Sequence, residues 1–297
     1  MQKLRTNIIG AGAMGHLWAS YLISQDSPLR FYTKKSQVPR LLELKSAQFN
    51  RSLDFRYCTF GDWQDCDLIL ICVKAHQLAP ACQELVNTKA KKCPIILMMN
   101  GMGLTDICAK ILPGWPVYHA YVTHGVYLED KQIIHAGLGI CQIGDGSQLP
   151  PANLESVIGL LNSALPPVTW NPSHQAQMNL KLIVNAIINP LTALSGKTNG
   201  SILKGNKLTP EAQTLFDEIS LLFPMLLPGL TKDAIQEKIE QVADLTKNNR
   251  SSMLQDVLRD AETEIDFING YLNQLARQNR ISLKLNTALI NKIKALA

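Results

Sequence analysis

Three polar side chains recur every four residues within one otherwise apolar segment of the chain. Lys181, Asn185 and Asn189 stand in the run KLIVNAIINP. In an α-helix four residues advance by about 400°, so each of these side chains lies about 40° from the previous one and all three share a stripe. A lysine and two amides on a buried helix need partners, because each one left unpaired costs on the order of one to several kcal/mol. A polar ligand in a cleft would supply them, although structural hydrogen bonds would satisfy them equally.

A glycine-rich turn near the start of the chain has the spacing of a phosphate-binding loop. It lies between an apolar strand at 7–9 and a helix-like stretch, and it comprises Gly10, Ala11, Gly12, Ala13, Met14 and Gly15. In a GxGxxG turn the first glycine permits the tight turn, the second lets the backbone approach a pyrophosphate, and the third lets helix and strand pack closely. The amino end of the helix then faces the phosphates. The turn therefore predicts a dinucleotide-binding site.

The end of the next strand indicates which dinucleotide is bound. In NAD-binding proteins an acidic residue about 20 residues after the turn holds the ribose 2′-hydroxyl. Here the strand at 29–32 leads into Lys34, Lys35 and Ser36, with no acid at that end. A carboxylate would repel a 2′-phosphate, whereas the lysines attract one. We therefore expect NADPH/NADP as cofactor with Lys34 and Lys35 near the phosphate; the alternative is that these lysines are ordinary solvated loop residues.

Polar residues also follow two continuously apolar strands. Lys74 follows the strand at 67–73, and Asn100 follows the strand at 94–99. The carboxyl ends of parallel strands are where such sheets bind ligands, so Asn100 is expected beside the nicotinamide. Later in the chain, Ser252 and Glu264 lie in an amphipathic helical stretch, where a helix cap or a solvated face explains them as well as a site does.

Alternating strands and helices in the first half, followed by helices alone, predict how these residues are positioned. Apolar runs at 7–9, 29–32, 68–73 and 95–99 indicate a parallel sheet, which strands at 117–122, 132–136 and 138–143 would complete. Helical patterns then cover 173–195, 210–227, 233–242, 251–277 and 286–296. We therefore expect an α/β protein with a Rossmann-type NADP-binding domain at 1–171 and an all-α substrate and catalytic domain at 172–297.

Length and composition are compatible with a two-domain globular enzyme. The chain has 297 residues and a formal charge of +5, which is too small and too dispersed to indicate nucleic-acid binding. The apolar runs at 182–194 and 220–230 are shorter than the roughly 20 residues that cross a bilayer, so no membrane span is expected. With no export signal at the start, a cytoplasmic protein is expected. Seven cysteines without a CxxC pair predict buried, reduced thiols, and no metal site is expected.

Taken together and in order, these motifs resemble the ketopantoate reductase (2-dehydropantoate 2-reductase) family. The resemblance rests on GAGAMG at Gly10, VKAHQ at Val73, NGMG at Asn100, KLIVNAIINPLTAL at Lys181, and SSMLQD with TEIDFINGYL from Ser251. It implies a C-terminal domain like that of 6-phosphogluconate dehydrogenase. It also implies transfer of a hydride from NADPH to the C2 ketone of ketopantoate, which yields pantoate for the synthesis of pantothenate (vitamin B5) and coenzyme A.

The resemblance also implies a role for each candidate residue. Lys181 is the catalytic lysine, which polarises and protonates the carbonyl oxygen, and Glu264 positions this lysine or binds substrate. Lys74 lies near the cofactor. The residues that contact the substrate are Asn185, Asn189 and Ser252, with Asn100 contacting both substrate and cofactor. A monomer or a homodimer is expected.

Two other functions remain open from the sequence. One is another NADP-dependent 2-oxo or 3-hydroxy acid dehydrogenase, such as the 3-hydroxyisobutyrate or 6-phosphogluconate type. The other is a non-catalytic dinucleotide sensor. The segment at 219–230 fits the family pattern less well because it is strongly apolar and contains two prolines, and Glu218 beside it is left out of the catalytic set.

Overall fold

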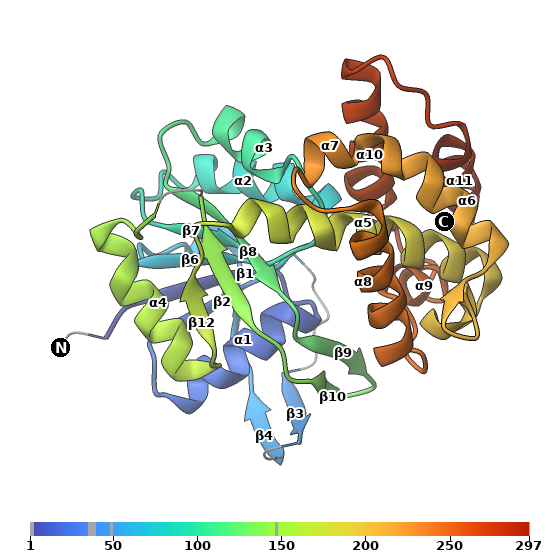
Figure 1. Ribbon diagram of the computed structural model, residues 1–297. Coiled ribbons are helices and arrows are strands. Elements are labelled where there is room, and N and C mark those ends of the chain that lie inside the picture. Colours follow the sequence, from blue (N-terminus) through green and yellow to red (C-terminus); the bar gives the residue numbers. More distant parts are fainter. Residues whose placement is uncertain (1–2, 35–39, 48–49, 146–147, 297) are drawn as a thin grey trace. The chain divides into compact units, whose positions relative to one another are not determined.

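The computed structural model describes residues 3–34, 40–47, 50–145 and 148–296, and these form two compact units (Figure 1). Unit 1 consists of Met1–Met99 and Leu104–Gln175, and unit 2 consists of Asn100–Gly103 and Ala176–Ala297. Unit 1 is built on a mainly parallel sheet and unit 2 is helical, which confirms the predicted fold class. The short segment Asn100–Gly103 belongs to unit 2, which the strand pattern around it did not predict.

The main sheet of unit 1 contains eight strands, all parallel except for the antiparallel pairing of β11 with β8. Its order is β12 (Val168–Trp170), β11 (Cys141–Gly144), β8 (Val117–Val122), β7 (Ile95–Leu97), β6 (Leu68–Ile71), β1 (Thr6–Ile9), β2 (Leu29–Tyr32) and β5 (Tyr57–Cys58). Strands β1, β6 and β7 are buried along their whole length. Their continuous apolar runs reflect helices on both faces of the sheet.

Four helices cover this sheet. Helix α1 (Ala13–Ser24) packs beside α4 (Ala152–Ala164), and α2 (Leu78–Asn87) packs beside α3 (Leu104–Ile111), with the two pairs on opposite sides of the sheet (Figure 1). Short 3₁₀ turns, η1 (Phe60–Asp62) and η2 (Ala75–Gln77), lie in the connections. The βα connections thus place the residues that follow β1 and β6 at one edge of the sheet.

A second sheet in unit 1 corrects one sequence-based expectation. It has the order β4 (Asn50–Asp54), β3 (Leu41–Ser46), β10 (Gln132–Gly137) and β9 (Gly125–Glu129). The strand predicted at 132–136 therefore does not complete the main sheet but pairs with β3 and β9. The chain returns to the main sheet through Gly139, where any side chain would collide with the backbone of Thr123 and His124.

A buried row of polar side chains joins this second sheet to α1. The Tyr21 hydroxyl lies 3.0 Å from His135 Nδ1, and His135 Nε2 lies 3.1 Å from His124 Nδ1. The Gly139 N–H also donates to His124 Nδ1 at 3.1 Å, so this nitrogen accepts hydrogen bonds and carries no proton. Burial, together with the nearby His135, lowers the pKa of His124 to about 4.

Acidification is therefore expected to destabilise the protein through His124. Its pKa lies below the ordinary value of 6.5, so between pH 6.5 and about pH 4 the unfolded chain binds a proton that the folded chain does not. The free energy of unfolding falls as the pH decreases through this window, by roughly 3 kcal/mol from this group. Urea unfolding at a series of pH values measures the slope. His124→Asn, which keeps an acceptor near Nδ1, should flatten it, and an unchanged slope would assign the effect elsewhere.

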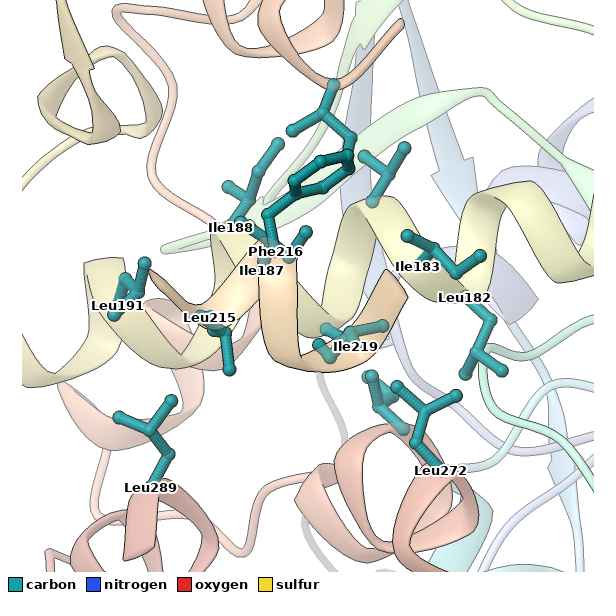
Figure 2. Close-up of a cluster of buried hydrophobic side chains, with 14 of the residues drawn as sticks. Leu182, Ile183, Ile187, Ile188, Leu191, Leu215, Phe216, Ile219, Leu272 and Leu289 are labelled. Carbon is teal, nitrogen blue, oxygen red and sulfur yellow. The ribbon is translucent and has the colours of Figure 1, made fainter. Parts of the chain in front are cut away.

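Unit 2 is organised around one long helix. Helix α5 (His174–Ser195) is buried by the helices that follow it, and Figure 2 shows its apolar side chains packed against those of α6, α10 and α11. The other elements are η3 (Asn199–Ile202), β13 (Leu203–Lys204), β14 (Lys207–Leu208), α6 (Pro210–Ile219), η4 (Ser220–Leu222), α7 (Phe223–Leu226), α8 (Lys232–Leu245), α9 (Ser252–Val257), α10 (Ile265–Gln278) and α11 (Lys284–Lys294). None of the described helices is both long and apolar enough to cross a membrane.

Two of the predicted helical stretches are interrupted. The stretch at 251–277 divides into α9 and α10 because Asp260 adopts a left-handed conformation, with φ of +49°, between them. The stretch at 210–227 divides into α6, η4 and α7, with Pro224 in the first turn of α7, where a proline is tolerated.

Buried amides tie α5, α10 and α11 together, and one carboxylate ties α6 to α11. The Asn269 amide on α10 donates to the Ala186 carbonyl at 2.9 Å and to Asn286 Oδ1 at 2.7 Å. Glu218 accepts hydrogen bonds from the backbone N–H groups of Leu285 and Asn286 at 2.8 and 2.7 Å. A carboxylate at the amino end of a helix satisfies free N–H groups and the helix dipole, so Glu218 has a structural role here.

Candidate active site

The glycine turn in unit 1 needs its glycines for steric reasons. Gly10 has a φ of +111°, and a Cβ there would lie 2.8 Å from the backbone carbon of Cys72. A Cβ on Gly15 would collide with the carbonyl oxygen of Gly10. Gly12 precedes α1 and supplies no side-chain cap, and the first turn of α1, which contains Ala13 and Met14, carries no acid. An uncapped helix start without a carboxylate suits a pyrophosphate.

Lysines predicted to contact the cofactor occupy the same unit. Lys34 lies just beyond β2, with Nζ 2.8 Å from Glu84 Oε1 on α2, and Lys35 lies outside the described residues. Lys74 follows β6, the strand beside β1, and its neighbour Val73 would be 2.8 Å from a Cβ on Gly10. Lys74 is half-buried and begins η2. The structure thus places Lys74 at the same sheet edge as the glycine turn.

Unit 2 contains a small pocket that gathers three of the predicted polar residues. Lys181 and Asn185 of α5 line it together with Asn100. The other lining residues are Gly101, Met102, Met178, Leu182 and Ile268, and the cavity volume is about 10 Å³, room for about one water, so a larger ligand must displace part of the lining. One lysine and two asparagines therefore share the lining with apolar residues. This lining chemistry matches a small ligand that carries polar oxygens at one side and apolar groups at the other.

Two glycines bring Asn100 to this pocket. Gly101 has a φ of +101°, and a Cβ there would lie 2.7 Å from the Cβ of Phe267 on α10. The next residue, Met102, donates its N–H to the Phe267 carbonyl at 3.0 Å. Gly103 also has a positive φ, +76°. The NGMG segment therefore packs directly on α10, and any larger residue at Gly101 would move Asn100.

The remaining predicted residues do not line the pocket. Asn189 is one turn beyond Asn185 and is buried, and Ser252 is the first residue of α9. Glu264 is buried at the amino end of α10, four residues before Ile268, which lines the pocket. Glu264 is thus the residue that directly precedes α10, the helix that carries Ile268 of the pocket lining.

Several residues with a place in this site were not predicted. Ser251, rather than Ser252, caps α9 by accepting from the Leu254 N–H at 3.1 Å, and Thr192 of α5 donates to it at 2.8 Å. This hydrogen bond holds the start of α9 against α5. The apolar lining residues Met178 and Ile268 carry no local signal, because both fit an ordinary core pattern. Within the described ranges no three His, Cys, Asp or Glu side chains gather to hold a metal ion.

Comparisons with known proteins identify relatives over nearly the whole chain. Residues 7–148 match the family described as ketopantoate reductase PanE/ApbA, and residues 173–297 match the family described as ketopantoate reductase PanE/ApbA C terminal. The chain is 34% identical to a 2-dehydropantoate 2-reductase of Vibrio cholerae, over 97% of this chain and 96% of that one. It is 31% identical to the protein of that name in Escherichia coli O157:H7, over 98% and 94%.

Solved structures with the same fold cover the chain equally well. A PanE/ApbA family ketopantoate reductase from Ralstonia eutropha JMP134 superposes with a TM-score of 0.85 at 20% identity, covering 98% of both chains. A D-mandelate dehydrogenase bound to NADH and anilino(oxo)acetate gives 0.84 at 20% identity, covering 98% of this chain and 97% of that one. A dimeric ketopantoate reductase from Staphylococcus aureus gives 0.81 at 20% identity, covering 99% and 98%. At these identities the three structures establish the shared fold.

Proposed function

The chain belongs to the ketopantoate reductase PanE/ApbA family, and from that premise we propose that it reduces ketopantoate (2-dehydropantoate) to pantoate with NADPH, a step of pantothenate biosynthesis. The observation that carries the proposal is the pocket in which Lys181 and Asn185 of α5 meet Asn100. A nicotinamide dinucleotide cofactor follows from the family, and the glycine turn of unit 1 fits its pyrophosphate. When bound, the cofactor supplies the hydride.

The polar side of the pocket fits the reaction. As the ketone at C2 is reduced, its oxygen gains negative charge, which a cation stabilises and a proton neutralises. We assign both tasks to Lys181, which lines the pocket and whose ammonium group can donate a proton to that oxygen. Glu264, buried at the start of α10, is assigned to position the lysine or the substrate.

The substrate has polar and apolar parts that match the lining. Asn185 and Asn100 are assigned to the carboxylate and hydroxyl groups, because amides can donate and accept hydrogen bonds. Asn189 and Ser252, which do not line the pocket, are assigned to the same groups of the substrate by the family resemblance. The two methyl groups of ketopantoate would contact the apolar wall, which contains Met178, Leu182 and Ile268.

A preference for NADPH over NADH is proposed from the charge at the end of β2. Lys34 is exposed there, and its ion pair with Glu84 is solvent-accessible, so the ammonium group can also bind a 2′-phosphate. Lys74 is assigned to the cofactor from its place at the same edge of the sheet as the glycine turn. Lys35, beyond the described residues, is kept as a second phosphate ligand on sequence grounds alone.

Lys34→Gln is expected to weaken NADPH binding about tenfold, since a charge-assisted hydrogen bond is worth roughly 1.5 kcal/mol or more. NADH, which lacks the phosphate, should bind as before. Fluorescence titration of both cofactors measures the two dissociation constants. Lys110→Gln, at an exposed lysine near the end of α3, is the matched control. Equal weakening for both cofactors would assign Lys34 to stability rather than to the phosphate.

The proposed activity is tested by following NADPH oxidation by the purified protein with ketopantoate and a panel of other 2-oxo acids, including phenylglyoxylate. We expect ketopantoate to give the highest kcat/KM. If another 2-oxo acid is reduced and ketopantoate is not, the assignments of fold and cofactor stand and the assignment of the substrate is wrong. Absence of turnover across the panel, with NADPH still bound, would indicate a dinucleotide sensor.

A further inference from the structure

Two thiols lie side by side at the edge of the main sheet opposite the glycine turn. Cys66 is two residues before β6 and Cys93 is two residues before β7, and their Sγ atoms are 3.8 Å apart. Strands β6 and β7 are parallel neighbours with Ile69 opposite Ile95, so the segments that lead into them also run side by side. Adjacent strands are about 4.8 Å apart, within the Cα separations of roughly 4.4 to 6.8 Å that a disulfide spans.

A surface pocket opens onto this pair. It has a volume of about 520 Å³, and Cys66 and Cys93 line it. The two cysteines are 8% and 7% exposed, so a small part of each residue's surface is open to a reagent in the pocket. A second pair, Cys82 and Cys108, has its Sγ atoms 3.6 Å apart but is 0% exposed. The two pairs have similar sulfur distances and differ in access.

The pocket also carries more positive than negative groups. Arg5 pairs with Asp67 at 3.2 Å, and Lys91 pairs with Asp65 at 3.7 Å. Lys92 donates to the carbonyl oxygen of Pro113 at 3.0 Å, so its charge is not offset in that contact. The three basic and two acidic residues named here all line the pocket, whereas Pro113 does not. Three cations against two carboxylates favour a reagent with negative charge.

We propose that Cys66 and Cys93 form a redox-active dithiol, which small anionic disulfides oxidise at this pocket to an intramolecular disulfide. In the first step the Cys93 thiolate attacks one sulfur of the reagent, its S–S bond breaks, and one small thiolate leaves. In the second step the Cys66 thiolate attacks the Cys93 sulfur of this mixed disulfide and releases the second thiolate. The protein gives up two protons and two electrons, and the reagent is reduced to two thiols.

The order of attack follows from the contacts of the pair. The hydrogen bond to Cys93 and burial raise the pKa of the Cys66 thiol, so the first attack is assigned to Cys93. Once Cys93 is in a mixed disulfide, the thiol hydrogen bond that raises the pKa of Cys66 is lost. Cys66 can then ionise more readily and complete the second step.

The test treats the folded, full-length protein with oxidised glutathione, then denatures it and alkylates every remaining thiol. Untreated protein has seven free cysteines, and the proposal expects five after treatment, with Cys66 and Cys93 joined in one cross-linked peptide by mass spectrometry. Cystamine, a cationic disulfide, should react more slowly at equal concentration. If seven thiols remain, the pair is not oxidised and the proposal is wrong. If glutathione disulfide and cystamine react at equal rates, the positive charge of the pocket does not select the reagent.

Variants and the second thiol pair provide the controls. Cys66→Ser should stop at a glutathione adduct on Cys93, whereas Cys93→Ser should acquire neither adduct nor cross-link. Cys82 and Cys108 should stay reduced; a cross-link between them would mean that oxidation follows general unfolding and would contradict the proposal. If circular dichroism shows that a serine variant does not fold, the cross-linked peptides of the unaltered protein alone test whether Cys66 and Cys93 form the disulfide. This experiment measures thiols and not catalysis, so a negative result would not bear on the proposed reductase activity.

Discussion

Lys181→Met is expected to lower kcat for ketopantoate by about a thousandfold, the range over which a positioned proton donor accelerates a reaction. Methionine keeps an unbranched side chain among Met178 and Leu182 but removes the ammonium group from the pocket. Steady-state kinetics and an NADPH titration measure the effect together. The dissociation constant of NADPH should stay within about twofold, since the loss concerns the developing charge on the substrate oxygen and not the cofactor.

A matched substitution separates this role from a general effect of charge. Lys197 lies two residues after α5 and is exposed, so Lys197→Met should leave both kcat and NADPH affinity unchanged. If Lys181→Met kept kcat within about tenfold of the unaltered protein, Lys181 would not be the proton donor. A loss of NADPH affinity matching the loss of kcat would also contradict the assignment.

Gly15→Ala is expected to raise the dissociation constant of NADPH by at least about a hundredfold. The added methyl group would collide with the Gly10 carbonyl oxygen, so α1 would have to move away from β1. That movement displaces the helix start from the pyrophosphate it is expected to bind. Isothermal titration calorimetry with NADPH measures the affinity, and circular dichroism establishes whether the variant is folded.

The control for this substitution is another helical glycine in the same unit. Gly159 lies in α4, and a Cβ there would meet nothing within 4 Å. Gly159→Ala should therefore leave NADPH affinity unchanged and raise stability by up to about 1 kcal/mol, because alanine favours a helix. A folded Gly15→Ala protein that binds NADPH normally would show that the close packing of α1 on the glycine turn is not needed for the cofactor.

Local patterns predicted the main sheet and part of the pocket. The apolar runs of β6 and β7 identified central strands, and the four-residue spacing on α5 predicted that Lys181 and Asn185 face the same way. Asn189 does not line the pocket. Asn189 is two four-residue steps from Lys181, and each step rotates the side chain by about 40° around the helix axis. The total rotation of roughly 80° keeps Asn189 on the same broad face of α5 but outside the small pocket.

Long-range contacts account for what the sequence did not predict. Asn100 reaches Lys181 because Gly101 packs against Phe267, more than 100 positions later in the chain, and no local pattern encodes that contact. The second sheet was missed because β4, with the sequence NRSLD, is polar and mostly exposed. Ser251 and Ser252 cannot be told apart as cap and first helical residue by spacing; the hydrogen bonds that Ser251 accepts from the Leu254 N–H and from Thr192 distinguish them.

The most direct test of the proposed reaction is the transfer of deuterium from NADPH to pantoate. NADPH deuterated at either hydrogen of the nicotinamide C4 is incubated with the protein and ketopantoate, and the product is analysed by mass spectrometry and NMR. We predict that one of the two labelled cofactors yields pantoate with deuterium at C2 and the other yields unlabelled pantoate. Formation of no pantoate from either, while NADPH remains bound, would contradict the assignment of this protein as a ketopantoate reductase.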